Sequence, residues 1–101
     1  MPLIRVGPIA DLPPGSVMEF RSGDGIYAIC NAGGELFAMD GVCPHASGPL
    51  GEGELNGYTV TCPWHAWDYD CRTGANDFDP GVKVDTFPVR IEGSDILIDI
   101  P

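Results

Sequence analysis

Glycine and proline interrupt this chain at short intervals, and their spacing limits the secondary structure that it can form. The 101 residues include 14 glycines and 10 prolines, and no long stretch keeps the apolar period of a helix. Both residue types are disfavoured inside helices and strands and are common in tight turns. The chain is therefore expected to fold as many short strands joined by tight turns, which is an all-β fold.

The expected strands lie mainly in the two ends of the chain. Turn sequences such as Gly23-Asp24-Gly25 separate the apolar segments of the first half, and Gly93-Ser94 separates the last two. In the final segment, isoleucines alternate with other residues at the period of two that is typical of a strand with one buried face. Strands are expected over residues 3–6, 16–21, 26–30, 35–39, 58–61, 86–92 and 95–100.

The middle of the chain, residues 40–80, has a different composition. It is rich in glycine, proline, cysteine, histidine and tryptophan, and only residues 58–61 read as a clear strand. So irregular a stretch buries little apolar surface by itself, and small folds of this kind are usually held together by a metal or a disulfide. The expected domain organisation is a single domain over residues 1–101, with this stretch organised by such a group.

The charge balance excludes some partners. The chain has 5 basic and 15 acidic residues, a net charge of −10, whereas nucleic acids and anionic membranes are bound by clustered lysine and arginine. No apolar run is long enough to span a membrane, and the N-terminus does not read as a signal peptide. A cytoplasmic location is expected, in which the four cysteines serve as metal ligands or buried thiols.

Each of the two histidines lies close to a cysteine. The pairs are Cys43-Pro44-His45 and Cys62-Pro63-Trp64-His65. Two thiolates and two imidazoles form a four-ligand set that favours zinc or an iron–sulfur cluster over magnesium or calcium. Common zinc folds place a cysteine pair before a histidine pair. The alternating order here favours a two-iron cluster in which the cysteines bind one iron and the histidines the other, with zinc as the alternative.

These motifs resemble those of the Rieske 2Fe–2S family, C-x-H followed by C-x-x-H. Gly48-Pro49-Leu50-Gly51 after the first motif and Thr73-Gly74 after the second are also similar to the family. The resemblance implies an antiparallel β-sandwich or barrel base with a small cluster-binding subdomain made of two loops, at about residues 40–82. It also implies one Rieske-type 2Fe–2S cluster per chain, bound by Cys43, His45, Cys62 and His65.

The resemblance assigns roles to several neighbouring residues. Tyr69 matches a tyrosine that donates a hydrogen bond to a ligand sulfur, and Pro80 matches a loop that closes over the cluster. Trp64 and Trp67 are expected to pack over the cluster, and Trp64 could also contact a partner. Trp67 replaces a serine that raises the potential in cytochrome bc complexes, so a low or intermediate potential is expected. Cys30 and Cys71 are expected to be buried thiols outside the ligand set.

The resemblance implies an electron carrier and not an enzyme. Both histidines are used by the cluster, so none remains for a second, catalytic iron site. The favoured role is the ferredoxin of a multicomponent aromatic-ring oxygenase, with a flavin-containing reductase and a terminal oxygenase as transient protein partners. The alternatives are a small Rieske-like component of NADH-dependent nitrite reductase and, more remotely, a zinc-stabilised interaction module.

Overall fold

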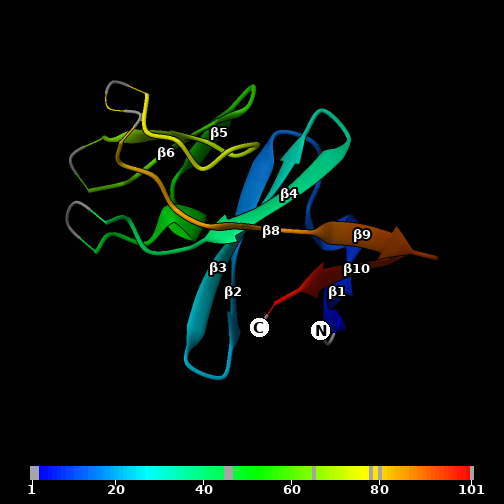
Figure 1. The fold of residues 1–101 in the computed structure, drawn as a ribbon. Coiled ribbons are helices and arrows are strands. Elements are labelled where there is room, and N and C mark those ends of the chain that lie inside the picture. The colour runs from blue at the N-terminus through cyan, green and yellow to red at the C-terminus, as the bar shows by residue number, and fades with distance from the viewer. Residues whose placement is uncertain (1–2, 45–46, 65, 78, 80, 101) are drawn as a thin grey trace.

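The computed structural model describes residues 3–44, 47–64, 66–77, 79 and 81–100, and these residues form three antiparallel sheets (Figure 1). Apart from the strands, they contain two short 3₁₀ helices, η1 (Ile9–Asp11) and η2 (Leu50–Glu52). The expected all-β fold is confirmed. No helix in the described part of the chain has the length and apolar character that crossing a membrane requires.

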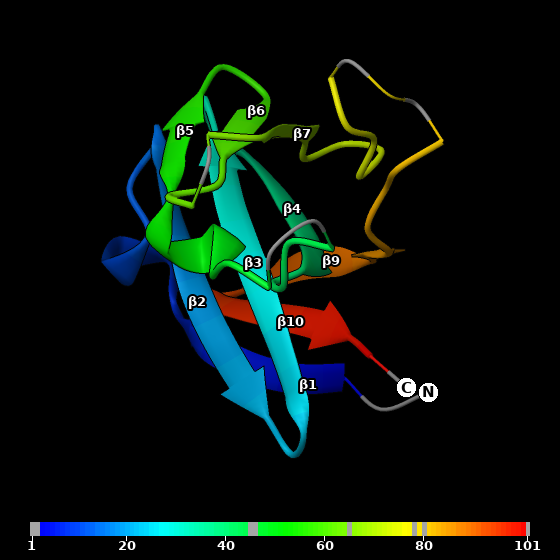
Figure 2. The same cartoon turned by 90° about the vertical axis from the view of Figure 1, so that its left-hand side faces the viewer.

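Two sheets form the base of the molecule, as the view in Figure 2 shows. The larger has the order β2-β3-β4-β8, from β2 (Ser16–Ser22), β3 (Gly25–Ala32), β4 (Glu35–Asp40) and β8 (Thr86–Phe87). The smaller has the order β1-β10-β9, from β1 (Leu3–Pro8), β10 (Asp95–Asp99) and β9 (Val89–Glu92). The hairpins of the larger sheet turn at Gly23 and Gly33, whose φ values of 58° and 66° suit glycine.

One expected strand is divided in the structure. Residues 86–92 were expected to be continuous, but β8 pairs with β4 whereas β9 pairs with β10. Pro88 lies between the two pieces and has no N–H to donate to a ladder, so the chain changes sheets there. The expected hairpin around Gly93 is confirmed, with Ile96 paired with Ile91.

The third sheet lies in the stretch that looked irregular. It has the order β5-β6-β7, from β5 (Glu54–Asn56), β6 (Thr59–Thr61) and β7 (Asp68–Asp70). Only the middle strand was expected, and the expectation of a single strand in this stretch is wrong. Strands of three residues are too short to show an alternating pattern, and their pairing with β6 creates them.

The larger base sheet has a buried core on each of its faces. Alternate residues of β3 point to opposite sides, so Ile29 packs toward the smaller sheet while Ala28 and Cys30 pack toward the third sheet. The first core is formed by Leu12, Ile29, Ala38, Ile96, Ile98 and Ile100. The second core contains Ala28, Cys30, Met39, Cys43, Leu50, Val60, Cys62, Tyr69, Cys71 and Val84. The second core therefore brings together Cys43 and Cys62, the cysteines of the two motifs.

Candidate metal centre

The two motif cysteines begin two loops of similar construction. In the first loop, residues 43–48, Cys43 N–H donates to the Gly48 carbonyl at 2.9 Å. In the second loop, residues 62–67, Cys62 N–H donates to the Trp67 carbonyl at 2.8 Å. Each loop also has a non-glycine residue with a left-handed backbone, Ser47 at φ 58° and Ala66 at φ 56°. Each loop is therefore closed by its own backbone, with its cysteine at the base.

The two cysteine side chains are buried together. Neither Cys43 nor Cys62 exposes more than 1% of its surface. Burial raises the pKa of the Cys62 thiol; the N–H of Trp64, 3.4 Å from its Sγ, opposes this, and the hydrogen bond with the Cys43 side chain raises it further. Two adjacent buried thiols resist ionisation in the absence of a cation, and a bound metal reverses that preference. The two thiols are therefore suited to act together as ligands of one metal ion.

A glycine makes the close approach of the two loops possible. A Cβ built on Gly48 would lie 2.6 Å from Cys62 Sγ and 3.1 Å from the Cβ of Trp64. No real side chain fits there without displacing the sulfur or the tryptophan. Gly48 was noted in the segment that follows the first motif, but its contact with the second loop is not visible in the sequence.

The phenol of Tyr69 reaches the same sulfur pair from β7. Its Oη lies 3.1 Å from Cys43 Sγ, and the side chain is completely buried. Burial, followed by the hydrogen bond with Cys43, raises the pKa of Tyr69, so the phenol stays protonated. A protonated phenol in this position has a proton to donate to a thiolate at Cys43.

The other site residues named from the sequence are placed differently. Trp64 is 49% exposed, whereas Trp67 is partly buried against the second core. His45, His65 and Pro80 lie outside the described residues. The structure thus brings together Cys43, Cys62 and Tyr69.

A buried asparagine next to this site was missed by the sequence analysis. Asn76 is 3% exposed; its Oδ1 accepts from Asp79 N–H at 3.0 Å, and its Nδ2 donates to the Asp68 carbonyl at 3.2 Å. An asparagine in a polar stretch reads as a turn residue. Its burial follows only from the pairing of residue 76 with Tyr69 in an isolated antiparallel bridge.

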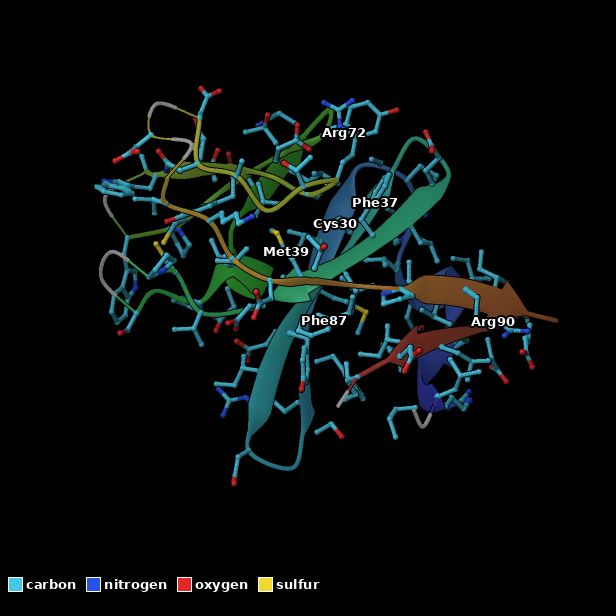
Figure 3. The ribbon with its side chains drawn as sticks, in the orientation of Figure 1. Cys30, Phe37, Met39, Arg72, Phe87 and Arg90 are labelled. Atoms are coloured by element: carbon cyan, nitrogen blue, oxygen red, sulfur yellow. The ribbon has the colours of Figure 1, made fainter. Side chains whose placement is uncertain are left out.

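The remaining two cysteines form a separate pair in the second core. Cys30 and Cys71 are both buried and free, and their side chains share a hydrogen bond. That contact and burial raise the pKa of Cys30, which remains a thiol. Figure 3 shows Cys30 and Met39 between the larger base sheet and the third sheet. The expectation of buried thiols is confirmed for both cysteines.

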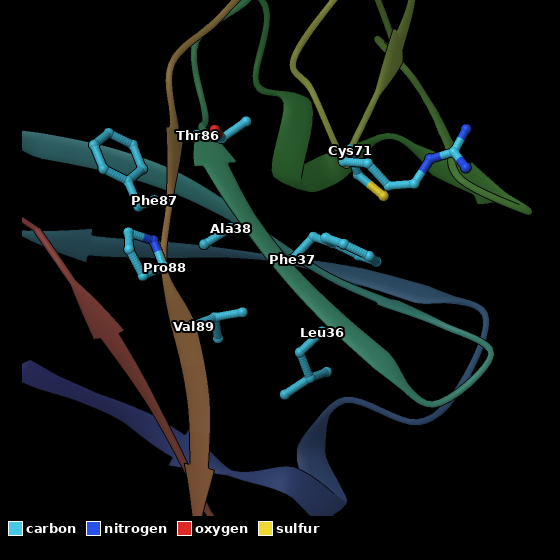
Figure 4. Close-up of a pocket in the computed structure, with 9 residues that line it drawn as sticks. Leu36, Phe37, Ala38, Cys71, Thr86, Phe87, Pro88 and Val89 are labelled. Atoms are coloured by element: carbon cyan, nitrogen blue, oxygen red, sulfur yellow. The ribbon is translucent and has the colours of Figure 1, made fainter.

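A surface groove of about 440 Å³ lies between β4 and the segment from β8 to β9 (Figure 4). Among its described lining residues the charged side chain is Arg72, which is already paired with Asp70 at 2.8 Å and stacked 4.0 Å from the Tyr58 ring centre. The groove is otherwise lined largely by apolar side chains such as Phe37 and Val89. The positive charge of Arg72 is therefore already paired within the protein.

Comparisons with known proteins give matches over most of the chain. Residues 3–88 match the family model described as the Rieske [2Fe-2S] domain. The ferredoxin component of biphenyl 2,3-dioxygenase from Rhodococcus jostii (strain RHA1) is 38% identical over 101 residues, which cover 99% of this chain and 94% of the relative.

Two solved structures extend the comparison to the whole fold. The Sphingomonas yanoikuyae B1 ferredoxin has a TM-score of 0.89 and 29% identity, covering 99% of this chain and 100% of that one. A chain in the complex of reduced oxygenase and oxidized ferredoxin in carbazole 1,9a-dioxygenase has a TM-score of 0.86 and 26% identity, covering 95% of this chain and 100% of that one.

Proposed function

Because this chain belongs to the Rieske [2Fe-2S] domain family, we propose that it carries single electrons from a reductase to the terminal oxygenase of an aromatic-ring dioxygenase-type system. Its cofactor is a Rieske-type 2Fe–2S cluster, and it serves as an electron-transfer component and not as a catalytic enzyme. The observation that carries the proposal is the burial of Cys43 and Cys62 side by side at the base of two matching loops.

The proposed ligands are Cys43 and Cys62 on one iron and His45 and His65 on the other. The buried thiol pair fits this assignment, and the two imidazoles come from the same two loops. When bound, the cluster supplies a one-electron couple with a potential above that of an all-cysteine plant-type ferredoxin. We assign the cluster-binding part to about residues 40–82 of one domain, residues 1–101.

The residues around the two cysteine sulfurs influence the reduction potential of the cluster. The Tyr69 hydroxyl lies 3.1 Å from Cys43 Sγ and would donate to a thiolate there, and the Trp64 N–H donates to Cys62 Sγ. Both contacts stabilise negative charge on sulfur, and thus the reduced state. Trp67 stands where the high-potential members of the family have a serine donor. We therefore propose a low or intermediate potential.

The proposed partners are a flavin-containing reductase and a terminal oxygenase. The relative from Rhodococcus jostii is a dioxygenase component, and one structural neighbour is a ferredoxin in complex with an oxygenase. Both favour an oxygenase over a nitrite reductase as the acceptor. Four of the five basic side chains pair with carboxylates of this chain, which leaves an excess of acidic groups to attract a basic partner face.

Trp64 supplies an exposed aromatic surface next to the proposed cluster, where a partner would dock. We also propose a cytoplasmic location. In the reducing conditions of that compartment the neighbouring Cys30 and Cys71 would remain thiols.

The deciding experiment is an iron and sulfide analysis combined with electron paramagnetic resonance of the dithionite-reduced protein. We expect about two irons and two sulfides per chain, and an average g value below that of an all-cysteine cluster. Cys43→Ala should abolish iron binding, whereas the matched variant Cys30→Ala should retain it. A colourless protein that binds zinc without sulfide, or equal loss of iron in both variants, would overturn the proposal.

A further inference from the structure

The contact between Tyr69 and Cys43 has a direction that the distance alone does not specify. Oη and Sγ are 3.1 Å apart, and either atom could be the donor. Only a proton donated to the sulfur favours the reduced state of a cluster bound there. A phenol O–H rotates about its C–O bond, so the other groups around the oxygen decide where the proton points and how strongly it is donated.

Asn76 is a second neighbour of this phenol. Tyr69 and Asn76 face each other in an isolated antiparallel bridge, beside the hydrogen bond from Asp77 N–H to the Asp68 carbonyl at 3.0 Å. Facing residues in such a bridge have their side chains on the same side, close together. Burial and then Cys43 raise the pKa of Tyr69, and the hydrogen bond from the Asn76 side chain opposes this rise, as an N–H donated to the phenol oxygen does.

The backbone fixes which end of the Asn76 amide is the donor. Oδ1 lies 3.0 Å from Asp79 N–H, a group that only donates, and Nδ2 lies 3.2 Å from the Asp68 carbonyl, a group that only accepts. Exchanging the amide oxygen and nitrogen would oppose donor to donor and acceptor to acceptor at both contacts. The NH₂ group is therefore the end available to the phenol, and the phenol oxygen accepts from it.

We propose that Asn76 is a positioning residue for electron transfer, which holds and polarises the Tyr69 hydroxyl so that its proton is donated to Cys43 Sγ. The inference rests on the proposed function, because it requires Cys43 to be a cluster ligand. The chain of donors runs from the Asn76 amide to the phenol and from the phenol to the sulfur. An oxygen that accepts one hydrogen bond donates a stronger one. Asn76 thereby raises the reduction potential without touching the ligand.

The test is a double-mutant cycle on the reconstituted protein, with Asn76→Leu, Tyr69→Phe and the double variant. The readout is the ratio of reduced to oxidised cluster at one fixed electrode potential. We expect Asn76→Leu to lower this ratio by roughly 1.3- to 5-fold. This is the expected loss if accepting a hydrogen bond from Asn76 strengthens the hydrogen bond from the phenol to the charged sulfur by about 10–30%. In the Tyr69→Phe background the same substitution should leave the ratio unchanged, because the hydroxyl through which Asn76 acts is absent.

A purely structural role gives a different result. Asn76 also anchors the backbone at Asp79 and Asp68, so a displaced loop would change the ratio equally in both backgrounds. Equal effects, or no effect in either background, would overturn the inference. If Asn76→Leu does not fold, Asn76→Asp retains the acceptor for Asp79 N–H while removing the amide hydrogens. The negative charge of the new carboxylate affects the cluster with Tyr69 or with Phe at position 69. The inference then requires the ratio of reduced to oxidised cluster to decrease further in the protein that retains Tyr69.

Failure of the proposed function is recognised separately in the same samples. A wild-type protein without the resonance spectrum of a mixed cysteine and histidine cluster would refute the carrier role before any variant is compared. A wild-type protein with that spectrum but without coupling between residues 69 and 76 would refute only the role of Asn76.

Discussion

Replacing Gly48 by alanine would place a methyl carbon 2.6 Å from Cys62 Sγ, with the Cβ of Trp64 a further obstacle at 3.1 Å. Non-bonded heavy atoms prefer separations of about 3.5–4.0 Å, so one of the two loops has to move by about 1 Å. The Gly48 carbonyl also accepts the N–H of Cys43. Movement of the first loop therefore displaces one proposed ligand, and movement of the second displaces the other.

The size of the effect follows from the cost of overpacking, which is about 1–3 kcal/mol. For a domain of this size, each kcal/mol lowers the melting temperature by about 4–8 °C, so the expected decrease is roughly 4–24 °C. The same free energy corresponds to a decrease of roughly 5- to 150-fold in the equilibrium retention of the cluster. Both effects have the same origin, because the strain lies between the two loops that hold the sulfurs.

The assay follows the visible absorption of the cluster during heating at one fixed rate, and the release of iron to a chelator. Gly7→Ala is the matched control, because a Cβ at Gly7 meets nothing within 4 Å. We expect Gly7→Ala to behave like the wild type and Gly48→Ala to lose its cluster earlier and faster. Equal behaviour of the two variants would refute the argument that the loops meet at Gly48.

Three further predictions address the hydrogen bonds and charges. Tyr69→Phe should lower the reduction potential by an amount on the order of tens of millivolts, measured by voltammetry, and an unchanged potential would mean that the phenol only packs. Arg72 holds the pKa of Asp70 below its usual value, so this contribution to stability is present at neutral pH and lost as the pH falls through the lowered pKa. The difference in urea midpoint between wild type and Asp70→Asn should accordingly be small at neutral pH and vanish in acid; a constant difference would contradict this. Stopped-flow association with the proposed reductase should slow as salt rises, and a salt-independent rate would exclude steering by the acidic surface.

The strands were predictable where their residues make a long pattern. The alternation of Ile96, Ile98 and Ile100 correctly indicated a strand with one buried face. The strands β5 and β7 escaped prediction because three residues carry no periodicity, and both exist through their pairing with β6. The division at Pro88 could have been anticipated from its missing N–H, but not the change of sheet that follows it.

By itself the sequence determined which chemistry is available. Two cysteine–histidine pairs at short spacing predict the donor atoms that we propose for the cluster, because ligand type and local spacing are properties of adjacent residues. Only the tertiary structure decided how that chemistry is adjusted. Tyr69 reaches a sulfur 26 positions away, and the orientation of Asn76 is fixed by backbone groups of two other residues. Such contacts depend on the direction of each donor and acceptor, which exists only after the sheets have packed.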